Sequence, residues 1–310
     1  MGPPQYTAFK KTDMTYLSEI KNEELAKNLL KHEKVLCIVN TRRHARQLYE
    51  LINSSDNSYH LSALMCPAHR TVVFKKIREA LNGKKPCRVI STQLVEAGVD
   101  IDFPVVYRSI SGIDSIAQAA GRCNREGKLA DNGKVYVFYP EAGLPPGYFR
   151  MAAETAEEVM RRHHDILTLV AVEDYFRTLY WRKGDKLDEF KILQDLSEGS
   201  KSGDYSFRRV ASKFKIIRDE MMPIIIPFNK EAAKIIDELR FGKFPAAAAR
   251  KAQRFTIQVP PRILGSLLSG GAVERIHDQY SILINRDIYR EDLGLCPEDP
   301  SFHEVESLIT

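Results

Sequence analysis

The stretch Arg88-Val-Ile-Ser-Thr-Gln-Leu-Val-Glu-Ala-Gly-Val-Asp-Ile-Asp102 runs from a short apolar segment into hydroxyl side chains, a glycine and two acidic residues. Its first part, residues 88–92, is typical of a buried strand bounded by a polar turn. Hydroxyls after a strand can bind phosphate, a glycine allows a tight bend, and a carboxylate can face a ribose or a metal-bound water. An ordinary solvated loop explains the same residues, so the stretch alone leaves both interpretations open.

Similar units lie on both sides of this stretch. Apolar runs at residues 35–39, 105–107 and 135–138 predict further strands, and helical spacing of apolar residues predicts helices at 45–52 and 70–81. Strands that alternate with helices form a mostly parallel, doubly wound α/β sheet, and functional loops follow the carboxyl ends of its strands.

The pattern changes after Pro140, where a connector rich in proline and glycine occupies residues 141–147. Two helical stretches (151–170 and 172–182), a polar loop (197–203) and four strands (214–217, 224–226, 255–259 and 280–284) are expected next. We therefore expect a first domain at residues 1–140, linker helices at 141–200 and a mixed α/β C-terminal domain at 201–310.

Composition sets limits on function. The 310 residues favour more than one domain, and 46 Lys and Arg against 41 Asp and Glu give a net charge of +5, which permits a polyanionic partner without requiring one. No apolar run reaches the roughly 18 residues of a membrane span, and no signal segment is seen, so we expect a cytoplasmic protein without a membrane partner. The five cysteines and eight histidines form no ligand cluster, which predicts reduced thiols and no metal site.

Two further segments fall where predicted strands or helices end. Asn40 and Thr41 follow a strand and open a helix, a position that suits either a phosphate contact or a plain helix cap. The segment Gln118-Ala-Ala-Gly-Arg122-Cys-Asn-Arg125-Glu-Gly127 places two arginines three residues apart after a glycine. Such arginines suit a trans-acting arginine finger on a phosphoryl group, and ordinary surface arginines are the alternative.

In this order and spacing, the three segments resemble motifs IV, V and VI of the second RecA-like lobe of superfamily-two helicases. In finer detail, S-T-Q-L-V-E-A-G-V-D-I-D-F and Q-A-A-G-R-C-N-R-E-G resemble the CRISPR-associated helicase-nuclease of type I systems, most of all its type I-C branch. Residues 174–181 and 210–217 are similar to that branch's linker and C-terminal domain. The resemblance implies a RecA-like parallel-sheet lobe followed by linker helices and a mixed α/β domain.

The resemblance also implies roles for single residues. Contacts with the backbone of the tracked DNA strand are implied for Asn40, Thr41, Ser91 and Thr92. A place at the nucleotide cleft is implied for Gly98, Asp100 and Gly121. Contacts with the ATP phosphates are implied for the catalytic candidates Gln118, Arg122 and Arg125. Many relatives carry an arginine directly after the motif VI glutamine, where this chain has Ala119.

Some parts of a helicase-nuclease are not found in the sequence. It contains no G-x-x-x-x-G-K-[ST] loop and no acidic box for Mg²⁺. We therefore expect no cofactor on this chain alone and no ATP hydrolysis by it, with ATP and Mg²⁺ bound in the complete enzyme. The implied partners are single-stranded DNA, an N-terminal HD nuclease with the first RecA-like lobe, and the Cascade surveillance complex; a phage anti-CRISPR protein is a further candidate.

Other interpretations stay open. The basic stretch at residues 240–255, with Arg250, Lys251 and Arg254, suits either a DNA-facing surface or a solvated helix face. A non-enzymatic nucleic-acid- or protein-binding module that keeps the helicase lobe as a scaffold is the main alternative function. A metal phosphohydrolase centred on His164 and Asp165 is a third, although the helix expected there explains the pair as packing.

Overall fold

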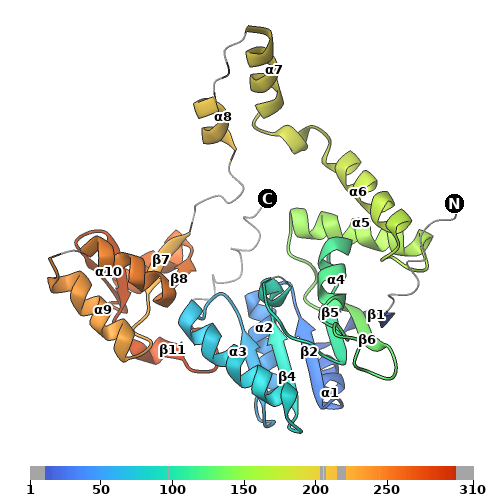
Figure 1. The fold of residues 1–310 in the computed structure, drawn as a ribbon, viewed down its shortest axis with the longest axis horizontal. Coiled ribbons are helices and arrows are strands. Elements are labelled where there is room, and N and C mark those ends of the chain that lie inside the picture. Colours follow the sequence, from blue (N-terminus) through green and yellow to red (C-terminus); the bar gives the residue numbers. More distant parts are fainter. Residues whose placement is uncertain are drawn as a thin grey trace.

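The computed structural model describes residues 11–297, apart from residues 97, 203, 204, 206, 215–220 and 244. A six-stranded sheet forms the first part of the chain, with the strand order β1-β6-β5-β2-β4-β3 and parallel pairing throughout. Its strands are β1 (Thr12–Ile20), β2 (Lys34–Ile38), β3 (Ser58–Leu61), β4 (Cys87–Ser91), β5 (Val105–Ser109) and β6 (Gly133–Pro140). The predicted doubly wound α/β sheet is thereby confirmed (Figure 1).

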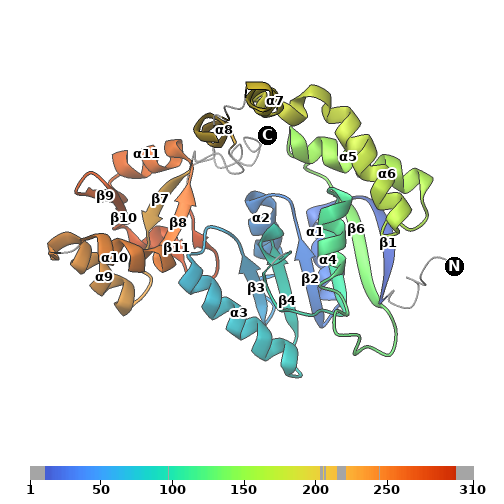
Figure 2. The same cartoon turned by 45° about the horizontal axis from the view of Figure 1, so that its top comes forward.

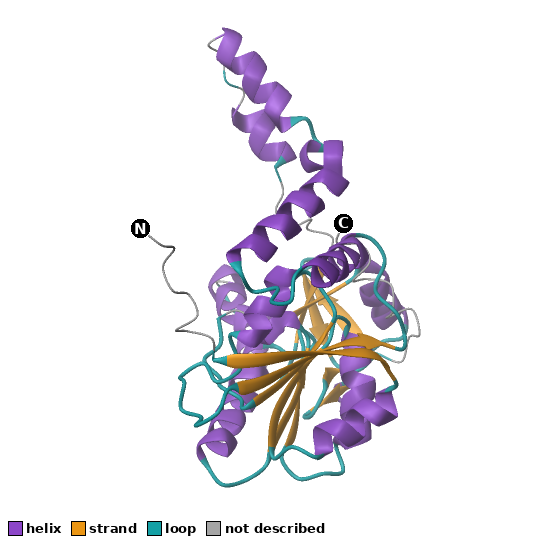
Figure 3. Ribbon diagram, turned by 90° about the vertical axis from the view of Figure 1, so that its right-hand side faces the viewer, coloured by secondary structure: helices purple, strands orange, loops and turns teal. Residues whose placement is uncertain are grey.

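Helices cover both faces of this sheet, as Figure 3 shows. Alternate residues of β2 point to opposite faces: Cys37 packs with α1 (Asn22–Leu30) and α2 (Arg42–Ile52), whereas Ile38 packs with α3 (Pro67–Asn82) and α4 (Ile113–Ala120). Because both faces of β2 are covered, the strand is buried from Val35 to Ile38, which is why those residues are all apolar. The edge strand β1 carries polar residues on much of its length, and the sequence analysis did not predict it.

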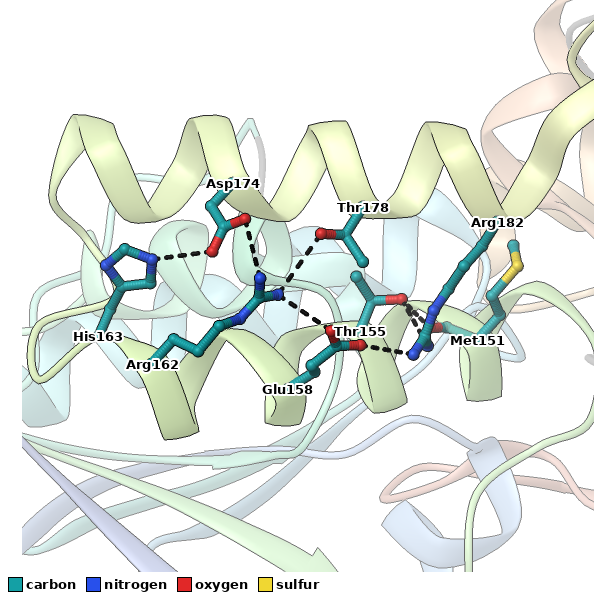
Figure 4. A network of polar contacts seen from close by, with 8 residues as sticks. All are labelled: Met151, Thr155, Glu158, Arg162, His163, Asp174, Thr178 and Arg182. Atoms are coloured by element: carbon teal, nitrogen blue, oxygen red, sulfur yellow. Dashed lines mark hydrogen bonds and ion pairs between the residues drawn. The ribbon is translucent and has the colours of Figure 1, made fainter.

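Helices α5 (Tyr148–Arg162) and α6 (Leu169–Lys183) follow the sheet and pack side by side against the same face as α4. Figure 4 shows polar contacts within and between these helices: Glu158 accepts hydrogen bonds from Arg162 of the same helix at 3.2 Å and from Arg182 of α6 at 2.6 Å. Asp174 accepts from Arg162 at 3.3 Å and contacts Nε2 of His163 at 2.8 Å. The pairs of Arg182 with Glu158 and of Arg162 with Asp174 thus link the two helices.

Beyond α6, the chain continues through a 3₁₀ turn at Gly184–Asp188 into α7 (Ile192–Ser202) and α8 (Phe207–Lys213), which project away from the sheet (Figure 1). Two expectations were wrong here. The polar residues 197–202 lie in α7 and not in a loop, and the Gln194 side-chain amide donates to Glu198 one turn further along this helix at 3.0 Å. The single helix expected over 151–170 is broken at His163–Thr168, where Asp165 accepts a hydrogen bond from the Leu167 N–H.

A second, four-stranded sheet has the order β8-β7-β10-β9. Its strands are β7 (Met222–Ile225), β8 (Thr256–Val259), β9 (Val273–Ile276) and β10 (Tyr280–Leu283), and its helices are α9 (Lys230–Phe241), α10 (Pro245–Ala252) and α11 (Pro261–Ser269). The strands expected at 224–226, 255–259 and 280–284 overlap β7, β8 and β10. Most of the strand expected at 214–217 falls outside the described residues. Strand β7 pairs with β8 and β10, a mixed pairing.

The two sheets are joined by a short two-stranded ribbon, β11 (Tyr289–Arg290) and β12 (Gly294–Leu295), which lies against the end of β3 (Figure 2). The Leu295 N–H donates to the Leu64 carbonyl at 3.0 Å, and the Tyr289 hydroxyl accepts from the Cys66 N–H at 3.1 Å. Gly294 has φ of 80°, and a Cβ there would meet the Leu64 carbonyl oxygen at 2.5 Å. Only glycine therefore fits this approach.

Candidate nucleotide and nucleic-acid interface

The first part of the site lies where β2 ends. Thr41 is the N-cap of α2, and its hydroxyl accepts a hydrogen bond from the His44 N–H at 3.1 Å. Asn40 is buried, and its amide nitrogen donates to the Ile110 carbonyl at 2.8 Å and to the Ser109 hydroxyl at 3.1 Å. The Asn40 side chain therefore ties β2 to the end of β5, and in this conformation its hydrogen-bonding groups are used inside the chain.

The neighbouring strand β4 supplies the second part. Ser91 is fully buried and donates to the Leu61 and Thr92 carbonyls at 3.2 and 2.9 Å, while Thr92 is almost fully buried. Gln93 then starts a 3₁₀ turn, and its amide nitrogen donates to the Asn40 carbonyl at 3.4 Å. Since β2 and β4 are adjacent and parallel, Asn40 and Thr92 lie at the same edge of the sheet.

The loop after that turn carries the candidate nucleotide-binding residues. Gly98 is exposed and has φ of 72°, a left-handed conformation that glycine adopts without strain. Asp100 is also exposed, and its carboxylate pairs with the Arg125 guanidinium at 2.7 Å. Asp102 accepts hydrogen bonds from the backbone N–H groups of Arg125 and Glu126 at 2.8 and 3.1 Å. These contacts hold the loop after β4 against the segment that carries Arg122 and Arg125.

The third part lies at the end of α4. Gln118 is exposed on the helix, and Gly121 is its C-cap. Arg122 is buried and donates to the carbonyls of Val99 at 2.6 Å and Glu96 at 2.7 Å. Burial is the main cause that lowers the pKa of its guanidinium, and the nearby Arg125 lowers it further. Ala119 is fully buried in the core, so its position contributes packing in this chain.

Two residues that the sequence analysis missed connect these parts. Arg108 on β5 and Glu96 after the 3₁₀ turn form an ion pair at 2.9 Å, with side-chain exposures of 0% and 6%. Burial raises the pKa of the Glu96 carboxyl and lowers that of the Arg108 guanidinium, and each residue partly offsets the shift of the other. A signal was present, because Arg108 is the charged residue of an otherwise strand-like run, Val105–Ser109.

The basic stretch lies elsewhere. Arg250 and Lys251 belong to α10 and Arg254 to the turn after it, beside the second sheet and away from β2 and β5 (Figures 1 and 2). Lys251 pairs with Glu238 at 3.1 Å and Arg254 with Glu231 at 3.2 Å. Arg250 is exposed and makes no ion pair with any residue that the structure describes. Acidic residues of α9 thus neutralise part of a stretch that contains no acid in its own sequence.

The His-Asp pairs have structural explanations. His164 is exposed in the turn between α5 and α6, and Asp165 stabilises that turn. His277 and Asp278 both have positive φ, of 52° and 53°, and form the turn between β9 and β10. Within the described part of the chain, no group of three or more His, Cys, Asp or Glu residues is arranged to hold a metal ion. Over the same residues, no helix is both long and apolar enough to cross a membrane.

Comparison with known proteins finds relatives of the part of the chain that carries these segments. The family described as "CRISPR-associated nuclease/helicase Cas3, C-terminal" matches residues 31–128, which include all three candidate segments. The CRISPR-associated nuclease/helicase Cas3 of Haloferax volcanii is 49% identical over 65 residues, which are 21% of this chain and 7% of that protein. That of Methanothermobacter thermautotrophicus is 32% identical over 109 residues, which are 35% of this chain and 12% of that protein.

Solved structures show the same fold over most of the chain. The crystal structure of T. fusca Cas3 superposes on 91% of this chain with a TM-score of 0.59 at 15% identity, and a CRISPR-associated protein superposes on 97% with a TM-score of 0.60 at 15% identity. The chain covers 40% and 42% of those two proteins. Residues 31–128 are thus similar to the C-terminal part of Cas3-type CRISPR-associated nuclease/helicases, and most of the chain shares the fold of solved Cas3 structures, of whose length it spans less than half.

Proposed function

We propose that the chain supplies the second RecA-like lobe and C-terminal region of an ATP-dependent helicase-nuclease that moves on single-stranded DNA during antiviral interference in the cytoplasm. In this proposal, residues 1–140 are the lobe, 141–200 the linker helices and 201–310 the C-terminal domain. ATP and Mg²⁺ are held mainly by a first RecA-like lobe, and an HD nuclease domain cuts the DNA. The type I-C branch and an anti-CRISPR partner stay predictions from the sequence.

One observation carries the proposal: three segments far apart in the sequence come together around the loop that follows β4. Asn40 and Thr92 lie side by side after β2 and β4, and Arg122 reaches the loop that carries Asp100. Loops at the carboxyl ends of parallel strands are where α/β proteins bind ligands. Arginines that contact such a loop can stabilise the charge that develops on a transferring phosphoryl group.

The roles proposed for single residues follow from these positions. Asn40, Thr41, Ser91 and Thr92 lie at the DNA side, and Gly98, Asp100 and Gly121 border the nucleotide. Gln118, Arg122 and Arg125 serve the ATP phosphates from across the interlobe gap. Exposed Gln118 and half-exposed Arg125 can reach a ligand without rearrangement of the core, whereas Arg122 must give up two hydrogen bonds to backbone carbonyls to do so.

A surveillance complex is the proposed recruiter. A chain in the solved structure titled "CRISPR RNA-guided surveillance complex, pre-nicking" superposes on 88% of this chain, with a TM-score of 0.52 at 16% identity. That likeness, together with the family match, supports Cascade as a partner.

The second candidate is a non-enzymatic binding module. The internal bonding of Arg122 favours it, because both terminal nitrogens of that side chain already donate to backbone carbonyls. Mixing the chain with an N-terminal Cas3 segment that carries the HD domain and first lobe separates the two functions. Restored ATP hydrolysis that single-stranded DNA stimulates supports the motor; DNA binding without any restored hydrolysis supports the module.

A further inference from the structure

A buried polar cluster lies beneath the proposed site, formed by Asn40, Glu96, Arg108 and Ser115. Arg108 is at its centre: Nη1 donates to the Asn40 side-chain oxygen at 2.6 Å and to the Ser109 carbonyl at 2.8 Å. Nη2 donates to the Ser115 hydroxyl at 3.0 Å. Arg108 thus holds residues from β2, β5 and α4 with one planar guanidinium group, whose rigid fork fixes their relative positions.

Glu96 completes this polar cluster from the loop after β4. One carboxylate oxygen pairs with Arg108 at 2.9 Å, and the other accepts a hydrogen bond from the Ser115 hydroxyl at 2.7 Å. A charged group in such a buried place is strongly destabilising when its partner moves away. The carboxylate, the guanidinium and the hydroxyl must therefore shift together or not at all.

The cluster connects both sides of the proposed site. Toward the nucleotide side, the Glu96 carbonyl accepts a hydrogen bond from Arg122 at 2.7 Å. Toward the DNA side, Arg108 holds Asn40, whose carbonyl also accepts a hydrogen bond from Gln93. Hydrogen bonds and one ion pair thus form a continuous chain from Asn40 through Arg108 and Glu96 to Arg122. Such a chain can carry coupling between two sites if its members have discrete arrangements.

We propose that Arg108 and Glu96 are positioning residues that couple DNA binding at Asn40 and Thr92 to nucleotide binding at Arg122. The inference rests on the proposed function and adds the route by which the two ligands influence each other. Neither residue touches DNA or ATP in this proposal. When Arg122 turns toward a triphosphate it releases the Glu96 carbonyl, and the ion pair passes the resulting shift to Arg108 and Asn40.

The test measures binding linkage in the chain joined to its N-terminal Cas3 segment. Affinity for fluorescent single-stranded DNA is measured with and without a non-hydrolysable ATP analogue, and affinity for the analogue with and without DNA. Each ligand must change the affinity for the other by the same ratio, and this ratio is the coupling factor. We expect it to be about 5 or more in the wild-type assembly. The variants are Glu96→Gln, which removes the charge, Arg108→Lys, which removes the fork, and Ser115→Ala, which removes the bridging hydroxyl.

Two control variants separate coupling from stability. Ile52→Val removes one methylene from the core on the opposite face of the sheet, and Arg177→Lys alters an exposed pair with Glu173 on α6. We expect the coupling factor to fall to between 1 and about 2 in the three cluster variants and to keep its wild-type value in both controls. Thermal melts identify variants that remain folded, and Ser115→Ala keeps the test available if Arg108→Lys does not fold.

The outcomes are distinct. If the wild-type assembly does not hydrolyse ATP, the proposed function fails and the coupling route falls with it. If it hydrolyses ATP but folded Glu96→Gln and Ser115→Ala assemblies keep the full coupling factor, the proposed function stands and the coupling route is wrong. Loss of coupling in Ile52→Val to the same extent would also overturn the route, because stability alone would then explain the effect.

Discussion

Arg125 and Asp100 form an ion pair of 2.7 Å at the surface of the site, with side-chain exposures of 46% and 80%. Exposed pairs of this kind contribute at most about 1 kcal/mol to stability, so a phosphate can replace Asp100 at little cost. Arg122, three residues earlier, is buried and donates to two backbone carbonyls. The two arginines of the same segment therefore differ: Arg125 is available to a ligand, while Arg122 organises the loop that follows β4.

This difference predicts unequal effects of the two arginines on stability. Arg122→Ala removes two charge-assisted hydrogen bonds and leaves buried carbonyls without a donor, so we expect it to lower the free energy of unfolding by about 2–4 kcal/mol. Arg125→Ala is expected to change it by about 0.5 kcal/mol or less. Urea unfolding of the isolated chain, followed by circular dichroism, measures both. Equal losses in the two variants would contradict the assignment.

Buried histidines predict that the lobe loses stability in acid. Burial lowers the pKa of His60 to about 3 and that of His44 to about 4. Both imidazoles stay neutral in the folded lobe, whereas in the unfolded chain they bind protons below a pKa of about 6.5. The free energy of unfolding is therefore at its full value above that pH and falls as the pH drops toward the pKa values of the folded state. Each histidine is expected to cost about 2 kcal/mol between pH 7.5 and pH 5.

The histidine prediction is checked by comparing unfolding at those two pH values in single variants. His60→Gln removes one of the two buried imidazoles, so its loss of stability between pH 7.5 and pH 5 should be about 2 kcal/mol smaller than that of the wild type. His164→Gln is the control, because His164 is exposed between α5 and α6. A pH dependence that is the same in all three proteins would show that these histidines do not set it.

The ribbon contact at Tyr289 predicts a stabilising link between the two sheets. Its hydroxyl accepts from the Cys66 N–H at 3.1 Å and lies 3.0 Å from Nδ1 of His69. Tyr289→Phe leaves that N–H without an acceptor and should lower the free energy of unfolding by about 1–3 kcal/mol. Tyr180→Phe, on an exposed residue of α6, should leave it unchanged. If thermal melts show the same stability for the two variants, the Tyr289 hydroxyl does not stabilise this contact.

The basic stretch predicts unequal contributions to DNA binding. If it faces DNA, Arg250→Ala should weaken binding of single-stranded DNA more than Lys251→Ala or Arg254→Ala, because Glu238 and Glu231 already pair with the latter two. Loss of one phosphate contact should also lower the slope of log K against log salt by about 0.7. Fluorescence anisotropy at several salt concentrations measures both quantities, and unchanged slopes in all three variants would indicate a plain solvated face.

Much of the first sheet was predictable because its strands are buried on both faces. A central parallel strand such as β2 is mostly apolar because both faces are covered, and its run from Val35 to Ile38 is visible in the sequence. The edge strand β1 has no such constraint, since many of its residues face solvent. In α7, polar residues of low helix propensity, among them Gly199, led to the prediction of a loop where the chain is helical.

The site was predictable as a set of segments but not as a network. Spacing along the chain pointed to Asn40, Thr92 and Arg122. Parallel topology places the first two after the carboxyl ends of β2 and β4, whereas the Arg122 backbone lies beside Phe103, before β5, and its side chain reaches back to the Glu96 carbonyl. The ion pair between Glu96 and Arg108 depends on which side chains face inward after folding. Likewise, the acids that neutralise Lys251 and Arg254 come from α9, an element separated from them in the sequence. A charged residue within a strand-like run, such as Arg108, signals a buried partner, but local sequence does not identify that partner.

ATP hydrolysis by the chain assembled with its N-terminal Cas3 segment is the most direct measurement of the central claim. We expect the wild-type assembly to hydrolyse ATP with stimulation by single-stranded DNA, and Arg125→Ala to lower that rate about a hundredfold or more, while the Arg177→Ala control on exposed α6 keeps it. Arg125→Lys should rescue only part of the rate, because a point charge cannot replace the planar fork. Full hydrolysis by a folded Arg125→Ala assembly would contradict the account.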